Sequence, residues 1–265
     1  MTSTALYFLC IALVSIAPVF VGILHCRGAW CSSSQERKSL VHEATAWLRE
    51  VLVLWCVGCL WPVQMLRRNW SRDPGDPSKV PVVLVPGYLE SETLMTPLRA
   101  ELKKRGRPYA TYKYKPLLGP GEDQAIRLLE FVRSLDSTKE AGPIDLVGHS
   151  FGGLLLRRLA QLAKPGEIGK LVLLATPHRG SEIAVFALGA AGRDLEPGSA
   201  FLQSLDEPPV PQCPVLDLRA SCDAMIQPRG AAVLNEDSER LEGPWGHNSM
   251  LIAEETIQRV LHFLD

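Results

Sequence analysis

Short apolar runs alternate with longer amphipathic segments from residue 80 to the C-terminus, and this alternation constrains the fold most strongly. The first of these runs, Val80–Val85, is continuous rather than alternating in polarity, which is typical of a strand buried on both faces of a parallel sheet. We therefore predict a doubly wound, mostly parallel α/β sheet with helices between its strands. The strand candidates are Val80–Val85, Tyr109–Tyr114, Ile144–Val147, Lys170–Ala175 and Val215–Leu218, and the helix candidates are Glu122–Leu135, Phe151–Ala163 and Ser249–Leu264.

Residues 179–211 interrupt the alternation with a polar segment rich in glycine and proline. It has room for two short helices, Glu182–Ala191 and Ala200–Leu205. Because it follows a strand, the segment is expected to lie over the carboxyl ends of the strands, where open α/β sheets bind ligands. We interpret it as a short, lid-like helical insertion.

The chain has 265 residues and a net charge of -1. This length accommodates one large domain with an additional segment, and the near-neutral charge argues against a nucleic-acid partner. The polar stretch Ser71–Lys79 contains two prolines and a glycine and is typical of a linker. We therefore divide the chain into an N-terminal region, residues 1–79, and a catalytic domain, residues 80–265.

Residues 5–24 contain no charged side chain. As a helix they would span about 30 Å, which matches the hydrocarbon core of a bilayer. A cleaved signal peptide would have a basic residue before the apolar run and a small-x-small site after it, and neither is evident. A retained membrane anchor is favoured over a removed signal.

A second apolar run, residues 51–65, lies between Glu50 and the pair Arg67-Arg68. It is short for a membrane span. A second span, a helix in the headgroup plane and a helix packed on the catalytic domain are three alternatives. Basic residues lie on both sides of this run, so the sequence predicts a membrane location with one or two spans and leaves the side of the catalytic domain open.

The seven cysteines give no strong signal. Cys56-x-x-Cys59 has the spacing of a metal site, but it lies in apolar sequence without a second pair of ligands. Cys213 and Cys222 flank a predicted strand, and whether they form a disulfide depends on the compartment. We expect neither a metal ion nor a cofactor.

The pattern Gly-x-Ser-x-Gly occurs at residues 148–152 and centres on Ser150. An apolar strand candidate precedes it and an amphipathic helix candidate follows it, which is the context that a nucleophile elbow requires. Glycines suit such a tight turn, since side chains at Gly148 and Gly152 would clash. The turn presents the serine hydroxyl and leaves the next backbone N–H at a helix start, where an anion is stabilised.

Residues 81–89, Pro-Val-Val-Leu-Val-Pro-Gly-Tyr-Leu, resemble the strand and oxyanion loop of lipase-type α/β-hydrolases, with Pro86 where many of them have a histidine. Residues 176–181, Thr-Pro-His-Arg-Gly-Ser, are similar to a stretch of bacterial lipases. The resemblance covers residues 80–265 and leaves the first 79 unexplained. It implies that the backbone N–H groups of Tyr88 and Phe151 form an oxyanion hole.

A serine nucleophile needs a base that an acid orients, and in this fold the chain order is Ser, acid, His. Among six histidines, His247 lies in a Gly-His step before the last helix, where the family keeps its base. His149 is expected to point away from Ser150, and His178 belongs to another loop.

The acid is expected just after the strand candidate Val215–Leu218. Asp223 has this position, and its surroundings resemble the family's Ser-x-x-Asp-x-x-x-Pro loop. Asp217 lies inside the strand, and Glu236 and Asp237 come later; these three compete with Asp223.

The sequence therefore predicts a membrane-anchored serine hydrolase that cleaves carboxylic esters of lipid-like acyl substrates through Ser150, His247 and Asp223. A thioesterase, phospholipase, amidase or acyltransferase could use the same triad, because one fold hosts many chemistries. A membrane-tethered binding protein without catalysis is the least favoured alternative. The acyl group, the head group and the oligomeric state are left open.

Overall fold

The computed structural model describes residues 22–23, 26–27, 39–66, 72–90, 92–114, 119–135, 143–208 and 213–265, with backbone alone for residues 57–66. Seven strands form one sheet in the order β1-β3-β2-β4-β5-β6-β7. All neighbouring strands are parallel except β1, which is antiparallel to β3. The predicted mostly parallel α/β sheet is confirmed. Its strands are β1 (Arg72–Asp73), β2 (Val82–Val85), β3 (Tyr109–Thr111), β4 (Ile144–His149), β5 (Ile168–Leu174), β6 (Val215–Arg219) and β7 (Glu239–Arg240).

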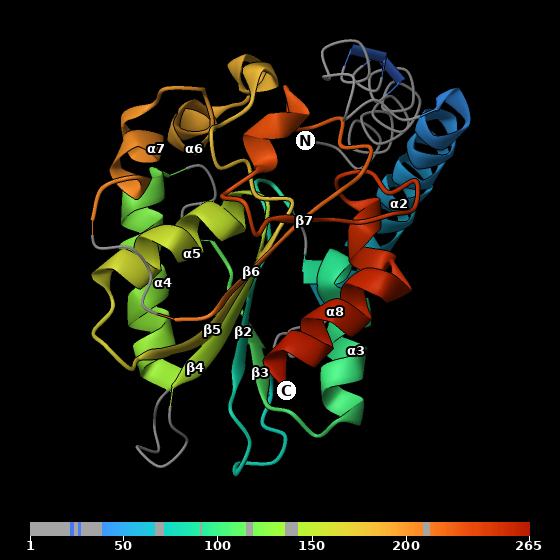
Figure 1. Ribbon diagram of the computed structural model, residues 1–265. Helices are drawn as coiled ribbons and strands as arrows, with labels where there is room; N and C mark the ends of the chain where they lie inside the picture. The colour runs from blue at the N-terminus through green and yellow to red at the C-terminus, as the bar shows by residue number, and fades with distance from the viewer. Residues whose placement is uncertain are drawn as a thin grey trace.

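Helices cover both faces of the sheet (Figure 1). α4 (Gly121–Leu135) and α5 (Phe151–Leu162) pack on one face, and α3 (Thr96–Lys104) and α8 (Glu254–Leu264) on the other. Side chains of β2 alternate between the two layers: Val82 and Leu84 join the α3 and α8 core, while Val83 and Val85 join the α4 and α5 core. This two-sided burial explains the continuous apolar runs.

The strand order reverses direction at β2. The chain passes from β2 to β3 on one side and then crosses to β4 on the other. In doubly wound folds the crevice that binds ligands lies at such a switch point, at the carboxyl edge of the sheet, and is bordered by the loops after the two strands. The loop after β2 contains Tyr88, and the turn after β4 contains Ser150.

The insertion forms η2 (Glu182–Phe186), α6 (Gly189–Asp194) and α7 (Ala200–Leu205). The last helix agrees with the prediction, whereas the segment predicted as Glu182–Ala191 is divided, because Gly189 has a φ of 74°. α6 is tied to α4 through the Gly121 N–H, which donates to Asp194 Oδ2 at 2.6 Å. α7 is tied to α5 through Arg157, which donates to the Leu205 carbonyl at 2.9 Å.

Two further segments differ from the sequence prediction. The stretch Ser71–Lys79, predicted as a linker, contributes β1 to the edge of the sheet. The helix predicted over Ser249–Leu264 consists of η4 (Ser249–Ile252) and α8. The break falls at Ala253, whose backbone is extended with φ -70° and ψ 126°.

The N-terminal region contributes α2 (Leu40–Leu66), whose second half contains the apolar run 51–65. Within the part of the chain that the structure describes, no helix is both long and apolar enough to cross a membrane. Glu43, Arg49 and Glu50 interrupt the apolar character of α2. Apart from Gly22 and Ile23, the predicted anchor at residues 5–24 lies outside the described residues.

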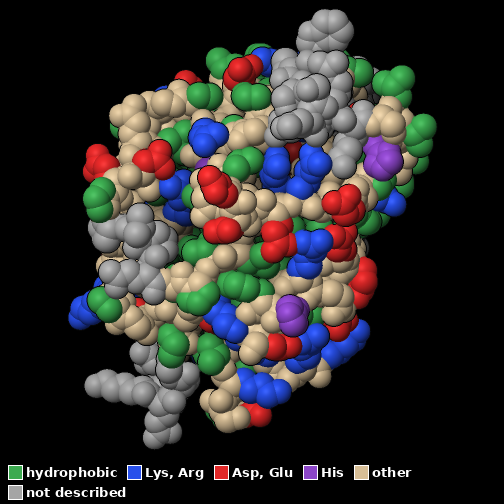
Figure 2. All heavy atoms as spheres, in the orientation of Figure 1, with side chains coloured by type: hydrophobic (Ala, Val, Ile, Leu, Met, Phe, Trp, Pro, Cys, Tyr) green, Lys and Arg blue, Asp and Glu red, His purple; other side chains and the backbone are tan. Residues whose placement is uncertain are grey.

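α2 lies beside the α8 face of the sheet (Figure 1) and contacts η4. Its two sides differ in exposure. Ala46 and Val53 are buried against the domain. Hydrophobic side chains gather on the outer surface over α2 and also over η2 (Figure 2). The exposed ones on α2 are Leu40, Val41, Leu48, Leu52 and Trp55.

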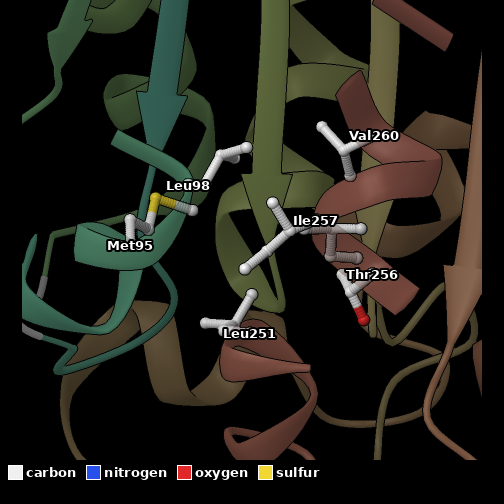
Figure 3. Close-up of a pocket in the computed structure, with 7 residues that line it drawn as sticks. Met95, Leu98, Leu251, Thr256, Ile257 and Val260 are labelled. Atoms are coloured by element: carbon white, nitrogen blue, oxygen red, sulfur yellow. The ribbon is translucent and has the colours of Figure 1, made fainter. Parts of the chain in front are cut away.

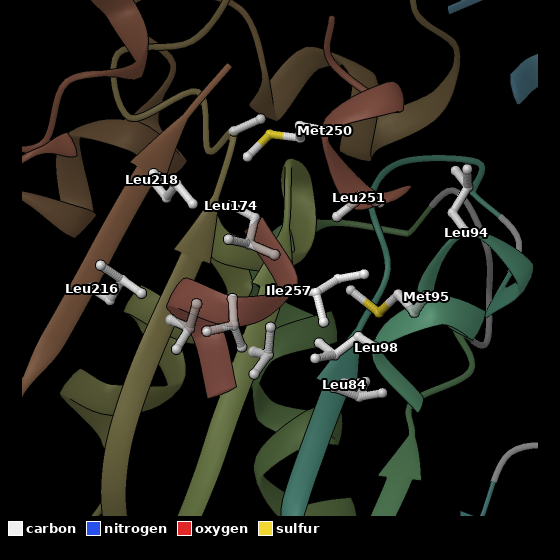
Figure 4. Packing of buried hydrophobic residues seen from close by; sticks show 14 of the residues in the cluster. Leu84, Leu94, Met95, Leu98, Leu174, Leu216, Leu218, Met250, Leu251 and Ile257 are labelled. Carbon is white, nitrogen blue, oxygen red and sulfur yellow. The ribbon is translucent and has the colours of Figure 1, made fainter. Parts of the chain in front are cut away.

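A small cavity lies between α3 and α8, and Figure 3 shows apolar side chains pointing into it from both sides. Its volume of about 10 Å³ is room for about one water molecule, so it is no substrate site. Thr256 supplies the polar side chain in a lining otherwise made of Met95, Leu98, Leu174, Leu251, Ile257 and Val260. The apolar cluster around it continues over β5 and β6 (Figure 4).

Cys213 and Cys222 are free thiols in the structure. Cys222 is buried, and Cys213 is half-buried. Burial and the neighbouring charge of Asp145 raise the pKa of the Cys213 thiol.

Candidate active site

Ser150 occupies a sharp turn between β4 and α5. Its φ of 52° and ψ of -122° are strained for a residue with a side chain. A Cβ on Gly148 would lie 2.7 Å from the Gly153 nitrogen, and a Cβ on Gly152 would lie 2.3 Å from the Val85 carbonyl oxygen. Glycine is therefore required at both positions, and the strand, turn and helix around Ser150 have the form that the sequence predicted.

Asp223 lies in the loop after β6 and is 2% exposed. Its Oδ1 accepts backbone N–H groups from Met225 at 2.8 Å and Ile226 at 2.9 Å, and its Oδ2 lies 2.8 Å from His247 Nδ1. Burial by itself would raise the pKa of Asp223, but His247 and the two backbone donors outweigh it and lower the pKa. The structure thus brings together the predicted acid and the predicted base.

His247 lies between β7 and η4 and is 5% exposed. Burial favours the neutral ring, but the carboxylates of Asp223, Glu90 and Glu50 favour the imidazolium and raise the pKa of His247 to about 9. Asp223 accepts the Nδ1 proton, so Nε2 is the nitrogen left to exchange a proton with a substrate or nucleophile.

The loop of His247 is tied to the residue before Ser150. His149 Nε2 lies 3.0 Å from the His247 carbonyl oxygen, and the two rings lie 4.8 Å apart between centroids. His149 Nδ1 lies 2.7 Å from Glu90 Oε1. Burial would raise the pKa of Glu90, but His149, His247 and the Gly87 N–H lower it.

The loop after β2 lies against the turn of Ser150. Carbonyl oxygens of Val85 and Pro86 approach Gly152, and Tyr114 donates its hydroxyl proton to the Pro86 carbonyl. In the same loop, the Tyr88 hydroxyl lies 2.8 Å from both the backbone nitrogen and the carbonyl oxygen of Leu188. Phe151 is the first residue of α5 and is buried. Both predicted oxyanion residues therefore lie at the crevice beside Ser150.

Asp217, which the sequence left as a competitor of Asp223, forms a separate buried pair with His178. His178 Nε2 lies 3.0 Å from Asp217 Oδ1, and Asp217 also accepts the Ser238 hydroxyl at 2.6 Å. Burial lowers the pKa of His178 despite the nearby Asp217. Glu236 and Asp237 are exposed. Of these acids, Asp223 is the one hydrogen-bonded to His247.

Glu90, His149 and His247 have ligand-type atoms within 4.8 Å of one another. The described hydrogen bonds already engage both nitrogens of His149 and the Nδ1 of His247. A metal ion would have to displace these bonds. We therefore treat the three residues as a hydrogen-bonded network.

A model of the alpha/beta hydrolase family matches residues 82–254. The chain belongs to the alpha/beta hydrolase family. The matched region contains Ser150, Asp223 and His247 and leaves out α2.

Individual relatives of this alpha/beta hydrolase are lipases. The chain is 40% identical over 60 residues to triacylglycerol lipases of Pseudarthrobacter phenanthrenivorans and Burkholderia plantarii. These 60 residues are 23% of this chain, 18% of the first lipase and 16% of the second. The chain therefore spans less than a fifth of their length.

Two lipase structures resemble this alpha/beta hydrolase in fold. Mature lipase BlEst2 of Bacillus licheniformis is 18% identical with a TM-score of 0.60, over 72% of this chain and 94% of that one. Aspergillus fumigatus lipase B is 15% identical with a TM-score of 0.58, and the match covers 70% of this chain and 52% of that one. Together with the family match and the curated names, they confirm the predicted resemblance to lipase-type α/β-hydrolases.

Sequence reasoning about this alpha/beta hydrolase missed the residues that support the predicted triad. The sequence predicts only that His149 points away from Ser150, whereas the structure shows it fully buried and in contact with the His247 loop. Glu90 was not considered. The signal that could have found them is a histidine and a glutamate in the two loops that meet at the switch point of the sheet.

Proposed function

We propose that this protein is a serine hydrolase that cleaves carboxylic esters through Ser150, His247 and Asp223. The observation that carries the proposal is the 2.8 Å contact between Asp223 Oδ2 and His247 Nδ1. The loop of His247 is in turn bonded to His149, the residue before the strained Ser150. An acid that orients a base beside a strained serine is the arrangement of nucleophilic acyl transfer.

The reaction proceeds in two halves. Ser150 Oγ attacks the ester carbonyl carbon while His247 Nε2 takes the hydroxyl proton. The backbone N–H groups of Tyr88 and Phe151 donate to the oxyanion. The alcohol leaves with the proton from His247, and an acyl group remains on Ser150. Water then attacks this acyl group through the same steps and releases the carboxylic acid and free Ser150.

We further propose a lipid-like acyl substrate. Large exposed apolar side chains lie in the loop after β2 and in the insertion: Leu89 is 52% exposed, Phe186 is 71% exposed, and Leu188 is 65% exposed. Leu89 follows Tyr88 directly, and the hydroxyl of Tyr88 bonds the backbone of Leu188. Exposed apolar groups around a site favour apolar ligands or surfaces. The family's lipase relatives also support this substrate class.

Membrane attachment is part of the proposal as well. Residues 5–24 have the length and apolar character of an anchor. The exposed leucines and Trp55 also give α2 an apolar surface. Fractionation of the full-length protein, with and without residues 5–24, tests this attachment: we expect the full chain in the membrane fraction, and an equal distribution of both forms would contradict it.

The activity is tested with a fluorophosphonate probe and a series of p-nitrophenyl esters of increasing acyl length. We expect labelling and hydrolysis by the wild type, and neither by Ser150→Ala. Hydrolysis should increase from the acetyl ester toward longer acyl chains. A folded wild type that is neither labelled nor active on any ester would overturn the proposed function.

A further inference from the structure

Helix α2 carries two carboxylates on the side that faces the domain. Glu43 is 7% exposed and Glu50 is 2% exposed. Seven positions separate them, which is close to two turns, so both lie on one face about 10 Å apart along the axis. A buried carboxylate destabilises the fold unless hydrogen bonds or an opposite charge compensate it. For both residues, the compensating groups belong to the loops that carry Asp223 and His247.

Glu50 holds the chain directly after His247. Its Oε1 accepts the backbone N–H of Asn248 at 2.8 Å and the side-chain amide of Asn248 at 2.6 Å. Its Oε2 accepts the backbone N–H of Ser249 at 2.9 Å. Three donors from two successive residues converge on one carboxylate, so the path of the chain leaving His247 is fixed by a side chain of α2.

Glu43 acts on the acid in the same manner, through an arginine. Its two oxygens accept from Nη1 and Nη2 of Arg229 at 2.6 and 2.8 Å, which is a bidentate pair of buried side chains. The Nε of Arg229 donates to the Asp223 carbonyl oxygen at 2.8 Å. The orientation that Glu43 imposes on the guanidinium thus fixes the backbone of Asp223.

Arg49 holds the same loop on the other side of His247. Its Nη1 donates to the Pro244 carbonyl at 3.1 Å, and its guanidinium lies 4.0 Å from the centre of the Trp245 ring. Such a cation–π contact adds to the hydrogen bond. Side chains of α2 therefore contact the loop both before and after the base.

We propose that α2 is a positioning element of the active site, in which Glu43 holds the acid loop through Arg229 while Glu50 and Arg49 hold the base loop. This inference rests on the proposed function. The helix lies outside residues 82–254, the region that the alpha/beta hydrolase family model matches. The inference also means that α2 and the catalytic domain act as one unit. The charge of Glu50 has a second effect, since it contributes to the raised pKa of His247.

The test compares Glu43→Gln and Glu50→Gln in the full-length chain. A glutamine at position 50 turns one acceptor oxygen into a donor that faces another donor, so the loop must shift. A displacement of about 1 Å at a catalytic group costs about 10²-fold in rate, and we expect a loss in kcat of this order with KM changed less than about twofold. Glu50→Gln should also move the pH dependence of kcat/KM to lower pH, because it removes a negative charge near His247.

The matched control is Asp145→Asn. Asp145 forms a comparably buried ion pair with Arg107, but it lies at the amino end of β4, roughly 16 Å along the strand from Ser150. We expect this variant to lower Tm and to leave kcat and the pH profile of the folded protein unchanged.

Two outcomes separate the two proposals. A folded but inactive wild type overturns the proposed function. An active wild type whose Glu43→Gln and Glu50→Gln variants match Asp145→Asn in kcat and in pH profile overturns the positioning role of α2. If Glu50→Gln does not fold, Arg49→Leu at a half-buried position replaces it, with an expected loss in kcat of about tenfold. An unchanged kcat in that variant counts against the inference in the same way.

Discussion

His247 Nδ1 lies 2.8 Å from Asp223 Oδ2, and both side chains are buried. A second histidine–aspartate pair of similar burial exists in the same domain, with His178 Nε2 3.0 Å from Asp217 Oδ1. The two pairs differ in their connections. The first is bonded through His149 to the chain beside Ser150, whereas the second joins the loop after β5 to β6.

This difference predicts that replacing aspartate by asparagine lowers kcat at position 223 but mainly lowers Tm at position 217. Asp223→Asn should reduce kcat by about 10⁴-fold, because the amide no longer holds His247 in the tautomer that accepts the Ser150 proton. Asp217→Asn should lower Tm through the loss of its His178 contact and leave kcat of the folded protein within about tenfold of wild type. Ester hydrolysis and thermal melting of both variants check this; a larger kcat loss in Asp217→Asn would contradict the assignment.

The turn at Ser150 gives a stability prediction. In Gly152→Ala, the new Cβ would lie 2.3 Å from the Val85 carbonyl oxygen and 2.4 Å from that of Pro86. Relief of this overlap requires backbone movement, and we expect the free energy of unfolding to fall by about 3 kcal/mol. Gly166→Ala is the control: its φ is 83° and no atom lies within 4 Å, so about 1 kcal/mol is expected. Urea unfolding of both variants measures the difference, and equal losses would refute the steric explanation.

The sheet and the triad residues could be predicted from sequence because their signals are local. A continuous apolar run such as Val80–Val85 indicates a buried strand directly, and the structure has β2 at Val82–Val85. The Gly-x-Ser-x-Gly pattern also carries its geometric reason in adjacent residues. Boundaries were less predictable: Lys170–Ala175 was expected where β5 runs over Ile168–Leu174, since pairing with neighbouring strands decides where a strand begins.

The role of α2 could not be predicted, because its partners are distant in sequence. Glu50 bonds residues 198 and 199 positions away, and Glu43 bonds Arg229 at 186 positions. For the apolar run after Glu50, the sequence left a second span, a helix in the headgroup plane and a helix packed on the catalytic domain as alternatives, without a basis for choosing the last. The available signal was the spacing: two acidic residues seven positions apart beside an apolar run lie on one helical face and need buried partners.

The small cavity between α3 and α8 gives a further prediction. Thr256 Oγ1 is buried there and has no hydrogen-bond partner among the described residues. Valine has the same shape without the hydroxyl, so Thr256→Val removes an unsatisfied polar group and should raise the free energy of unfolding by about 1 kcal/mol. Thermal melting measures this change. A fall in Tm instead would mean that the hydroxyl is stabilising, and Thr256→Ser, which keeps the hydroxyl, should not raise Tm.

The charges around His247 predict the pH dependence of the reaction. Only the neutral ring accepts the Ser150 proton, and the pKa of His247 is raised to about 9. Because protonation of the free enzyme limits kcat/KM, this parameter should rise with pH and level off above a midpoint near 9. Glu90 is one of the carboxylates that favour the imidazolium, so Glu90→Gln should move the midpoint to lower pH.

Asp73→Asn serves as the control for that shift. Asp73 lies on the outer strand β1 at the amino end of β3 and pairs with Lys103, away from the crevice. Its substitution should leave the midpoint unchanged. Profiles of kcat/KM against pH, measured at constant ionic strength for the three proteins, distinguish the outcomes. A midpoint that is the same in wild type and Glu90→Gln, or that rises in Glu90→Gln, would show that Glu90 does not stabilise the charged form of the base.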